Sequence, residues 1–278
     1  YSDNSTNYNN KNDHELYSVA MIKTQYPLKK KLENSNNYLK PVISAKISPN
    51  NNTINISGDD VRLDYNNLFS LNRIGRSDIV EGGRSLAMGV EFEKQNLSDE
   101  KIFGFNIGNV FKDKKSSNLP TKSKLDQTRS DIVGDISLNL SNNFDLEYKF
   151  SYDRDLDYSN YDSIGAKFEV NNFVTSFDYV TENHELGNSE IINNTTELKF
   201  NDEHSLTFSS TKDLKEDFTE YVNFIYQYKT DCLLALLEYD KKFYSDGNLT
   251  PSENLLFLIK FIPFAEIRGS AKTLVTKY

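Results

Sequence analysis

Residues Phe144–Asp153 read FDLEYKFSYD, and this stretch indicates the fold class. Aromatic and aliphatic residues alternate in it with charged or polar ones, and the apolar set is Phe144, Leu146, Tyr148, Phe150 and Tyr152. Successive side chains of an extended chain point to opposite faces. The stretch therefore predicts a β-strand with one apolar face and one charged face.

The same alternation recurs along most of the chain, for example at 136–140, 164–170, 222–229 and 255–261. It predicts about thirteen strands of roughly nine to eleven residues, the length with which a tilted strand crosses a bilayer. Their centres are expected near Ser18, Ile43, Met88, Phe105, Leu138, Tyr148, Lys167, Phe177, Leu198, Phe208, Phe224, Leu237 and Phe257.

The connections between these strands differ in length in a regular way. Tight polar turns are expected at 141–143, 171–172, 201–203 and 229–231. Longer polar loops are expected between them, at 112–130, 154–160, 181–192, 212–219 and 243–252. Outer-membrane barrels have short periplasmic turns and longer extracellular loops, so the alternation favours a barrel. One connection, 25–37, disagrees, because it is long where a short turn is expected and carries Lys29, Lys30 and Lys31.

Composition excludes several other classes. The chain has 278 residues with a mean hydropathy of −0.63, and no apolar run is long enough for a membrane-spanning helix. The 17 Tyr and 18 Phe are too many for a disordered tail. A net charge of −9 argues against a nucleic-acid partner. The chain begins at Tyr1 without an initiator Met or a signal-peptide pattern, which predicts a mature piece or a fragment.

A soluble β-sandwich or a β-solenoid would also alternate. Loop asymmetry, strand length and the abundance of Tyr and Phe favour an all-β, antiparallel transmembrane β-barrel. An odd strand number would make this chain part of a larger outer-membrane barrel, because single-chain bacterial barrels close with even numbers. The expected organisation is a polar leader or loop at 1–13, a barrel portion at 14–263 containing a long loop at 48–83, and a C-terminal periplasmic tail at 264–278.

Candidate catalytic residues are sparse. The three histidines, His14, His184 and His204, have no zinc-ligand spacing. A rim protease would need a histidine beside a carboxylate, and His184 next to Glu185 is the one candidate, although a solvated loop histidine explains it as well. We therefore expect no enzyme activity, no metal and no cofactor.

The long loop at 48–83 has an unusual composition. It combines apolar residues such as Leu68 and Phe69 with charged residues such as Arg73 and Glu81. Long loops with apolar content of their own tend to be packed or functional. We expect a loop folded inward over the lumen with its charges paired to the polar wall; the alternative is a plain surface loop.

Within this loop, residues 64–83 read DYNNLFSLNRIGRSDIVEGG. They resemble the Asn-Leu-Phe, Asn-Arg-Phe, Asp-Arg and Glu-Gly-Gly signature of the LPS-assembly family LptD, also called organic solvent tolerance protein. The resemblance assigns these residues to a lumen loop motif: Asn67, Leu68, Phe69, Asn72, Arg73, Asp78, Glu81, Gly82 and Gly83. Ile79 departs from the family, which usually has Arg there, and Gly75-Arg76 departs from its usual Ser-Gly.

Two further segments agree with this family. Residues 25–28, QYPL, are similar to its Arg-Tyr-Pro-Leu stretch, and residues 251–263 are similar to its final strand. Cys232 lies where the family often has a Cys-Cys pair, with Leu233 in place of the second cysteine. The resemblance implies a disulfide from Cys232 to an N-terminal periplasmic domain; a lone buried-type thiol is the equal alternative.

The resemblance implies the last step of lipopolysaccharide (LPS) export at the cell outer membrane. Lipid A would leave for outer-membrane lipid through a lateral gate, and sugars would pass through the lumen. One lip of the gate would be the last strand, with Glu253, Asn254, Leu255, Phe257, Ile259, Phe261 and Pro263. The implied partners are LPS, a lipoprotein plug (LptE-like) and a periplasmic LPS bridge protein (LptA-like), with no nucleic acid. The alternative function is a general porin-like diffusion channel.

Overall fold

The computed structural model describes residues 18–49, 55–58, 60–76, 79–183, 187–243, 251–262 and 265–274. These residues form strands and very little helix. The elements are β1 (Ala20–Gln25), β2 (Leu28–Lys31), β3 (Asn36–Ser48), α1 (Tyr65–Leu68), β4 (Gly83–Gln95), β5 (Lys101–Lys112), η2 (Thr121–Ser123), β6 (Ile132–Ser141), β7 (Phe144–Tyr152), β8 (Ser159–Val170), β9 (Phe173–Glu182), β10 (Ser189–Lys199), β11 (His204–Asp213), β12 (Phe218–Lys229), β13 (Leu233–Lys242), β14 (Ser252–Phe261) and β15 (Ala265–Leu274). No helix in the described ranges has the length and apolar character needed to cross a membrane.

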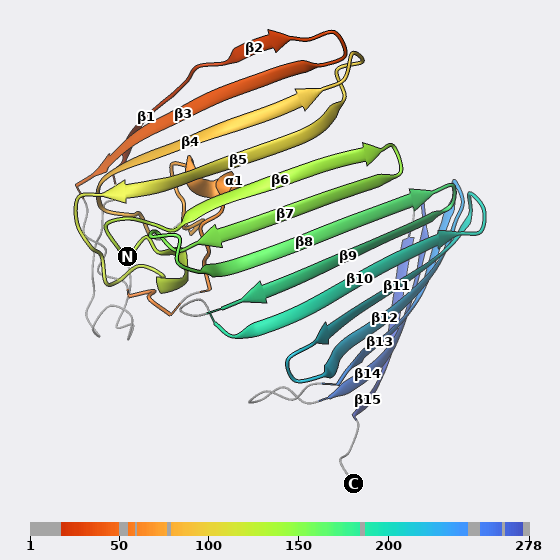
Figure 1. The fold of residues 1–278 in the computed structure, drawn as a ribbon. Helices are drawn as coiled ribbons and strands as arrows, with labels where there is room; N and C mark the ends of the chain where they lie inside the picture. The colour runs from red at the N-terminus through yellow and green to blue at the C-terminus, as the bar shows by residue number, and fades with distance from the viewer. Residues whose placement is uncertain are drawn as a thin grey trace. The chain divides into compact units, whose positions relative to one another are not determined.

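The strands form one 15-stranded sheet in which chain neighbours pair in sequence order from β3 to β15 (Figure 1). The registers resolved at both ends of this order are antiparallel, as for β3 with β4 and β13 with β14. The predicted all-β, antiparallel fold class is confirmed, and the deciding stretch forms β7, Phe144–Tyr152.

The expectation of a long connection at 25–37 is wrong, because this segment contains β2. Both β1 and β2 pair with β3, β1 with 42–47 and β2 with 36–39. They are therefore one strand position interrupted at Tyr26-Pro27, and a tight turn follows, in which the Leu32 amide donates to the Ser35 carbonyl at 2.8 Å. The connection from β2 to β3 is therefore a short turn, as the alternation of short turns and long loops predicts. Within the described residues, the fifteen strands occupy fourteen positions, so the odd strand number expected from the sequence is not observed there.

The expected C-terminal tail at 264–278 is also wrong, because β15 occupies 265–274. It pairs with β14 along its whole length, from Phe261 opposite Ala265 to Ser252 opposite Leu274. The segment 253–263 is therefore not the last strand. It forms most of β14, which has hydrogen-bonded neighbours on both sides.

The connections fall into two classes by the end of the strands at which they lie, and each end is called an edge below. At one edge, called the short-turn edge, they span 32–35, 96–100, 142–143, 171–172, 200–203, 230–232 and 262–264. At the other, called the long-loop edge, they span 49–82, 113–131, 153–158, 183–188, 214–217 and 243–251. The predicted long loop at 212–219 is reduced to four residues, because β11 and β12 extend into it.

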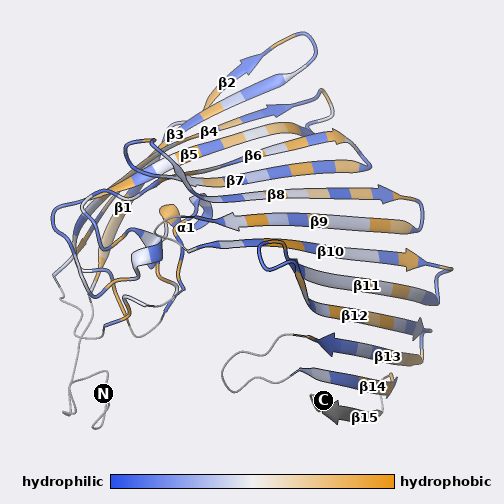
Figure 2. Ribbon diagram, turned by 60° about the horizontal axis from the view of Figure 1, so that its bottom comes forward, coloured by the Kyte–Doolittle hydropathy of each residue, from blue (hydrophilic) through white to orange (hydrophobic). Residues whose placement is uncertain are grey.

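The chain divides into two compact units. The first contains β1–β5, the loops at 49–82 and 113–131, parts of β6–β8 and the last residue of β9, Glu182. The second contains the remaining parts of β6–β9 and all of β10–β15. Bands of hydrophobic and hydrophilic residues alternate along the strands of both (Figure 2). Each unit is described by itself below.

In the first unit, the two faces of the sheet differ in polarity and in what covers them. One, called the apolar face, carries Ile43, Ile47, Leu86 and Met88, whose side chains are between 39% and 48% exposed. The other, called the polar face, carries buried Ser44, Lys46, Ser85 and Lys112, together with buried Val42, Ala87, Val110 and Val133. The apolar core packs against this polar face, underneath the long loops.

In the second unit, the alternation continues through β12, β13 and β14. Phe224, Leu237 and Phe257 are between 40% and 48% exposed on one face. The opposite face is polar near the long-loop edge, where Asn223 Nδ2 donates to Glu238 Oε1 at 2.7 Å and Asn254 Nδ2 donates to Asp240 Oδ2 at 2.9 Å. One exposed apolar face and one hydrogen-bonded polar face are the pattern of a transmembrane barrel wall.

Candidate functional site

The centre of the loop motif is a single helical turn, α1. Asp64 precedes it in extended conformation and forms a capping box with Asn67. The Asp64 carboxylate accepts from the Asn67 amide at 2.8 Å, while the Asn67 side chain accepts from the Asp64 amide at 3.0 Å and donates to the Arg62 carbonyl at 2.9 Å. Reciprocal capping satisfies amides that a helix start leaves unpaired. Asn67 therefore fixes the turn that orients the next two residues.

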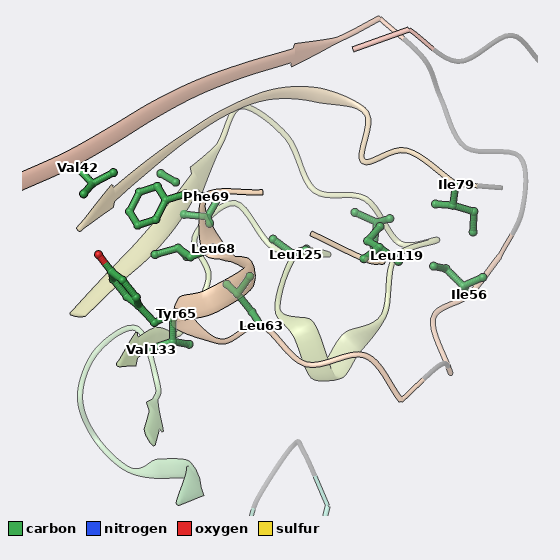
Figure 3. Close-up of a cluster of buried hydrophobic side chains, with 13 residues drawn as sticks. Val42, Ile56, Leu63, Tyr65, Leu68, Phe69, Ile79, Leu119, Leu125 and Val133 are labelled. Carbon is green, nitrogen blue, oxygen red and sulfur yellow. The ribbon is translucent and has the colours of Figure 1, made fainter. Parts of the chain in front are cut away.

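Those residues, Leu68 and Phe69, pack on the polar face of the sheet together with Tyr65 (Figure 3). Leu68 is fully buried, and Tyr65 and Phe69 meet edge to face with ring centres 5.6 Å apart. They lie over Gly89 and Gly108, which are directly paired between β4 and β5. A Cβ at Gly108 would approach Leu68 Cδ2 to 2.5 Å, and one at Gly89 would approach Phe69 Cζ to 2.9 Å. The two glycines therefore create the flat surface on which the motif sits.

A second loop, 113–131, closes the cluster from the other side. It contributes the buried side chains of Leu119 and Leu125. Backbone hydrogen bonds join it to the first loop, from the Ile56 amide to the Asn118 carbonyl at 2.9 Å and from the Thr121 amide to the Ser57 carbonyl at 3.2 Å. The two longest connections at the long-loop edge thus form one packed structure over the polar face.

A buried ion cluster holds the end of the motif to the sheet. Glu81 accepts from Lys46 Nζ at 2.5 Å and from Arg73 Nη1 at 2.8 Å, and Lys112 Nζ lies 3.7 Å from its other oxygen. The four side chains are at most 2% exposed. Lys46 and Lys112 come from β3 and β5, while Arg73 and Glu81 come from the loop, so the cluster joins loop to wall.

Further hydrogen bonds of Arg73 fix its position in the cluster. Its Nε donates to the Leu68 carbonyl at 2.8 Å, and Nη1 also donates to Ser85 Oγ at 3.0 Å. Arg73 therefore links the end of α1, the Glu81 carboxylate and β4. A planar guanidinium can do this because its donors have a fixed fork geometry.

Three cations around one carboxylate determine its protonation. Burial alone would raise the pKa of the Glu81 carboxyl, but Arg73, Lys46 and Lys112 together lower it below its ordinary value. Glu81 is therefore ionised at neutral pH.

The remaining described motif residues shape the loop backbone. The Asn72 side chain accepts from the amides of Ile74 and Gly75, both at 3.1 Å. Gly83 has a φ of +90°, and a Cβ there would lie 2.8 Å from Asp113 Oδ1. Gly82 is partly buried immediately before β4, and Asp78 lies outside the described residues.

A second, more exposed ion group lies at the long-loop edge. Glu182, at the end of β9, pairs with Arg62 and with Lys122, whose Nζ is 3.1 Å from Glu182 Oε2. Lys122 also lies 3.0 Å from Asp60 Oδ1. The hydrogen bond from Lys122 lowers the pKa of Asp60. This group ties both loops to the end of β9.

The other residues expected from the sequence lie away from this cluster. Glu253 and Asn254 contact Tyr239 and Asp240 of β13, and Leu255, Phe257 and Phe261 are exposed. Ile259 lies opposite Ile267 of β15, and Pro263 lies outside the described residues between β14 and β15. Cys232 is an exposed free thiol at the short-turn edge.

Of the histidines, His14 and His184 lie outside the described residues. His204 contacts Tyr226, with Nδ1 2.6 Å from the hydroxyl oxygen. The part of the chain that the structure describes contains no group of His, Cys, Asp and Glu placed to hold a metal ion.

Sequence reasoning missed the wall residues of the site: Lys46, Ser85, Gly89, Gly108 and Lys112. The lysines occupy polar positions of alternating strands and are not distinguishable there from other polar residues. The glycines carried a signal, because Gly inside a strand often marks the close approach of another segment.

The comparison with known families agrees with this geometry. The model of the family "LptD: LPS transport system D" matches residues 1–226, which include the whole loop motif and its wall. The chain belongs to the LptD family. Among curated proteins, no match was found.

Solved structures similar to this LptD-family chain include Rhodopseudomonas blastica porins, with very low identity. A Rhodopseudomonas blastica porin triple mutant has 9% identity and a TM-score of 0.43, and the alignment covers 92% of this chain and 85% of the porin. A structure described as "Asymmetric conductivity of engineered proteins" has 10% identity and a TM-score of 0.43, covering 92% and 86%. Similarity at this level carries no argument about function.

Proposed function

We propose that this LptD-family chain forms part of an outer-membrane barrel that assembles LPS into the outer leaflet, without catalysis. The observation that supports the proposal most is the placement of the family motif. The loop packs on the polar face of the sheet, while the apolar face of the same strands stays exposed. An exposed apolar face is stable against lipid, and a polar face suits an aqueous lumen.

In this proposal the two parts of LPS follow different surfaces. The sugars move along the polar lumen face, and lipid A passes between strands into outer-membrane lipid. Strand separation in lipid is costly, because each unpaired backbone group costs several kcal/mol. β14 is paired with both β13 and β15, so in this proposal the lateral exit does not open along 253–263. A lipoprotein plug in the lumen and a periplasmic bridge protein are the proposed partners.

We further propose that Cys232 forms a disulfide with an N-terminal periplasmic domain of the full-length protein. Its exposure at the short-turn edge, the periplasmic side of a barrel, supports this. A shift in non-reducing gel mobility that Cys232→Ser abolishes is the expected result, whereas equal mobility of the two proteins would contradict it.

The test of the main proposal uses cells depleted of the full-length protein. Newly made LPS is followed by its access to a lipid A-modifying enzyme that acts only at the cell surface. We expect this modification to be lost and LPS to accumulate inside the cell. Normal surface LPS with altered uptake of small solutes would overturn the proposal in favour of a diffusion channel.

Two complementing variants connect the test to the loop motif. Glu81→Gln disturbs the buried ion cluster, whereas Glu216→Gln makes the same change at an exposed position on a connection at the long-loop edge. We expect Glu216→Gln to restore surface LPS fully and Glu81→Gln to restore it only in part. If both variants restore surface LPS equally, the ion cluster of the loop motif does not contribute to transport.

A further inference from the structure

A polar groove lies on the polar face of the first unit, near the short-turn edge. It has a volume of about 290 Å³ and lies across β3, β4 and β5. Small-molecule sites begin at roughly 300 Å³, so the groove has room for about one sugar-sized ring. Its lining includes the side chains of Tyr38, Lys40, Glu91, Glu93, Gln95 and Lys101.

The strand register explains the hollow. Tyr38 lies opposite Glu93, and Glu93 lies opposite Gly104 of β5. Gly104 has no side chain, and the Lys101 ammonium occupies the space above it, 2.5 Å from where a Cβ would be. Lys101 therefore extends across the groove floor beside Glu93.

The groove offers hydrogen-bond donors and acceptors in close alternation. Gln95 Nε2 donates to Glu93 Oε1 at 2.5 Å, Lys40 pairs with Glu91, and Lys101 adds further donors. Alternating donors and acceptors match the hydroxyl groups of a sugar, each of which both donates and accepts. The Tyr38 ring supplies an apolar surface at the same place.

Cations extend the groove toward the neighbouring strand. Lys29 of β2 lies over the Tyr38 ring at 4.8 Å, and Lys31 follows two residues later on the same face. All four residues of β2 are exposed. Exposed ammonium groups beside a sugar-sized groove suit an anionic substituent such as phosphate or carboxylate.

The groove also contacts the loop motif. Tyr65 of α1 donates from its hydroxyl to Glu91 Oε1 at 3.3 Å. A ligand bound in the groove would therefore lie beside Glu91, the wall residue that Tyr65 of the loop contacts. This places the groove on the periplasmic side of the loop in the proposed barrel.

We propose that this groove binds a sugar ring of LPS that carries an anionic substituent. The identity of the ligand rests on the proposed function. Glu93 and Gln95 contact hydroxyl groups, Lys101 donates to oxygen atoms of the sugar, and Lys29 and Lys31 contact the anionic group.

Photocrosslinking in cells tests the groove with the full-length protein. A photoreactive benzoylphenylalanine replaces Gln95, or its neighbour Lys94 on the opposite face, or Glu147, a polar-face residue of β7 outside the groove. Adducts are detected with an LPS antibody. Mild acid then cleaves the acid-labile bond between lipid A and the core sugars.

We expect an adduct at Gln95 that keeps its sugars after acid treatment, and none at Lys94. An adduct at Gln95 that keeps only lipid A would overturn the proposal, because the groove would then hold the lipid part. An adduct at Glu147 without one at Gln95 would contradict sugar binding in the groove but would leave the proposed transport function standing. No adduct at any position, together with normal surface LPS after depletion, would overturn both.

A charge variant provides the quantitative test. Lys101→Gln should lower the Gln95 adduct yield about tenfold, as expected for the loss of one charge-assisted hydrogen bond. Lys94→Gln on the opposite face is the matched control and should leave the yield unchanged. Equal yields in both variants would remove Lys101 from the site and contradict the proposal.

Discussion

Replacing Glu81 by glutamine removes the carboxylate that three buried cations share. Lys46, Arg73 and Lys112 then remain at most 2% exposed without their counter-charge. Removing one partner of a buried ion pair costs roughly 3–5 kcal/mol. Arg73 is on the loop and the two lysines are on the wall, so detaching the loop relieves this cost. We therefore expect Glu81→Gln to lower the free energy of loop opening by most of this cost of roughly 3–5 kcal/mol.

Limited proteolysis of the full-length protein in detergent measures that opening. Arg73 is buried in the docked loop, so trypsin can cut after it only when the loop detaches. When opening and closing are fast, the cleavage rate follows the population of the open form. A change of roughly 3–5 kcal/mol then predicts about a 100-fold to a few thousand-fold faster cleavage after Arg73. Cleavage after exposed Lys115 is the internal reference and should not change.

Lys112→Met is the comparison that separates electrostatics from simple loss of packing. It leaves Glu81 with its two closer partners and removes one of the mutually repelling cations. Its expected cost is about 1–3 kcal/mol, mainly the lost hydrogen bond from this charged donor to the Leu125 carbonyl, which is less than the cost in Glu81→Gln. Unchanged cleavage after Arg73 in Glu81→Gln, or a larger increase in Lys112→Met, would refute the reasoning.

Four further outcomes follow from the same contacts. The pKa of Glu81 in the docked loop is lowered from 4.5, so the ionised carboxylate stabilises the docked loop fully above pH 4.5. This stabilisation is lost as the pH falls through the pKa of the docked state, so hydrogen exchange of the loop amides, corrected for intrinsic rates, should rise at that pH. Gly108→Ala should lower the free energy of loop opening, measured by the trypsin assay, by about 1–3 kcal/mol. Gly58→Ala should leave it unchanged, because a Cβ there would meet open space. Asp64→Ala should cost about 1 kcal/mol in that assay through loss of the helix cap. Glu182→Gln should change the cleavage rate less than Glu81→Gln, since its partners are about 29% exposed and such pairs contribute about 0–1 kcal/mol.

The strand pattern was predictable wherever both faces of the sheet have a fixed environment. The alternation at 144–153 gave β7 nearly to the residue, because each face has its own polarity requirement. The two strands that were missed lack this signal. β2 reads LKKK and is wholly exposed, and β15 is rich in small and charged residues. Their pairing with neighbours holds them in the sheet, and no alternation in their own sequences revealed it.

Within the site, the loop side was predictable and the wall side was not. The apolar pair Leu68 and Phe69 beside Arg73 and Glu81 indicated a packed loop with paired charges. The residues that receive the loop are distant in sequence, since Lys46 lies 35 positions before Glu81. Only the register that pairs Gly89 with Gly108 brings the receiving surface together, and that register is a property of the folded sheet.

The position of the apolar core explains why this sheet needs lipid. In a soluble sandwich the apolar faces of two sheets cover each other and the polar faces meet water. In the first unit the core lies between the loops and the polar face, so it does not cover the apolar face at all. Ile47 and Met88 remain 48% and 42% exposed on that uncovered face. The same strands therefore require protein and water on one side and an apolar solvent on the other, and a bilayer provides that solvent.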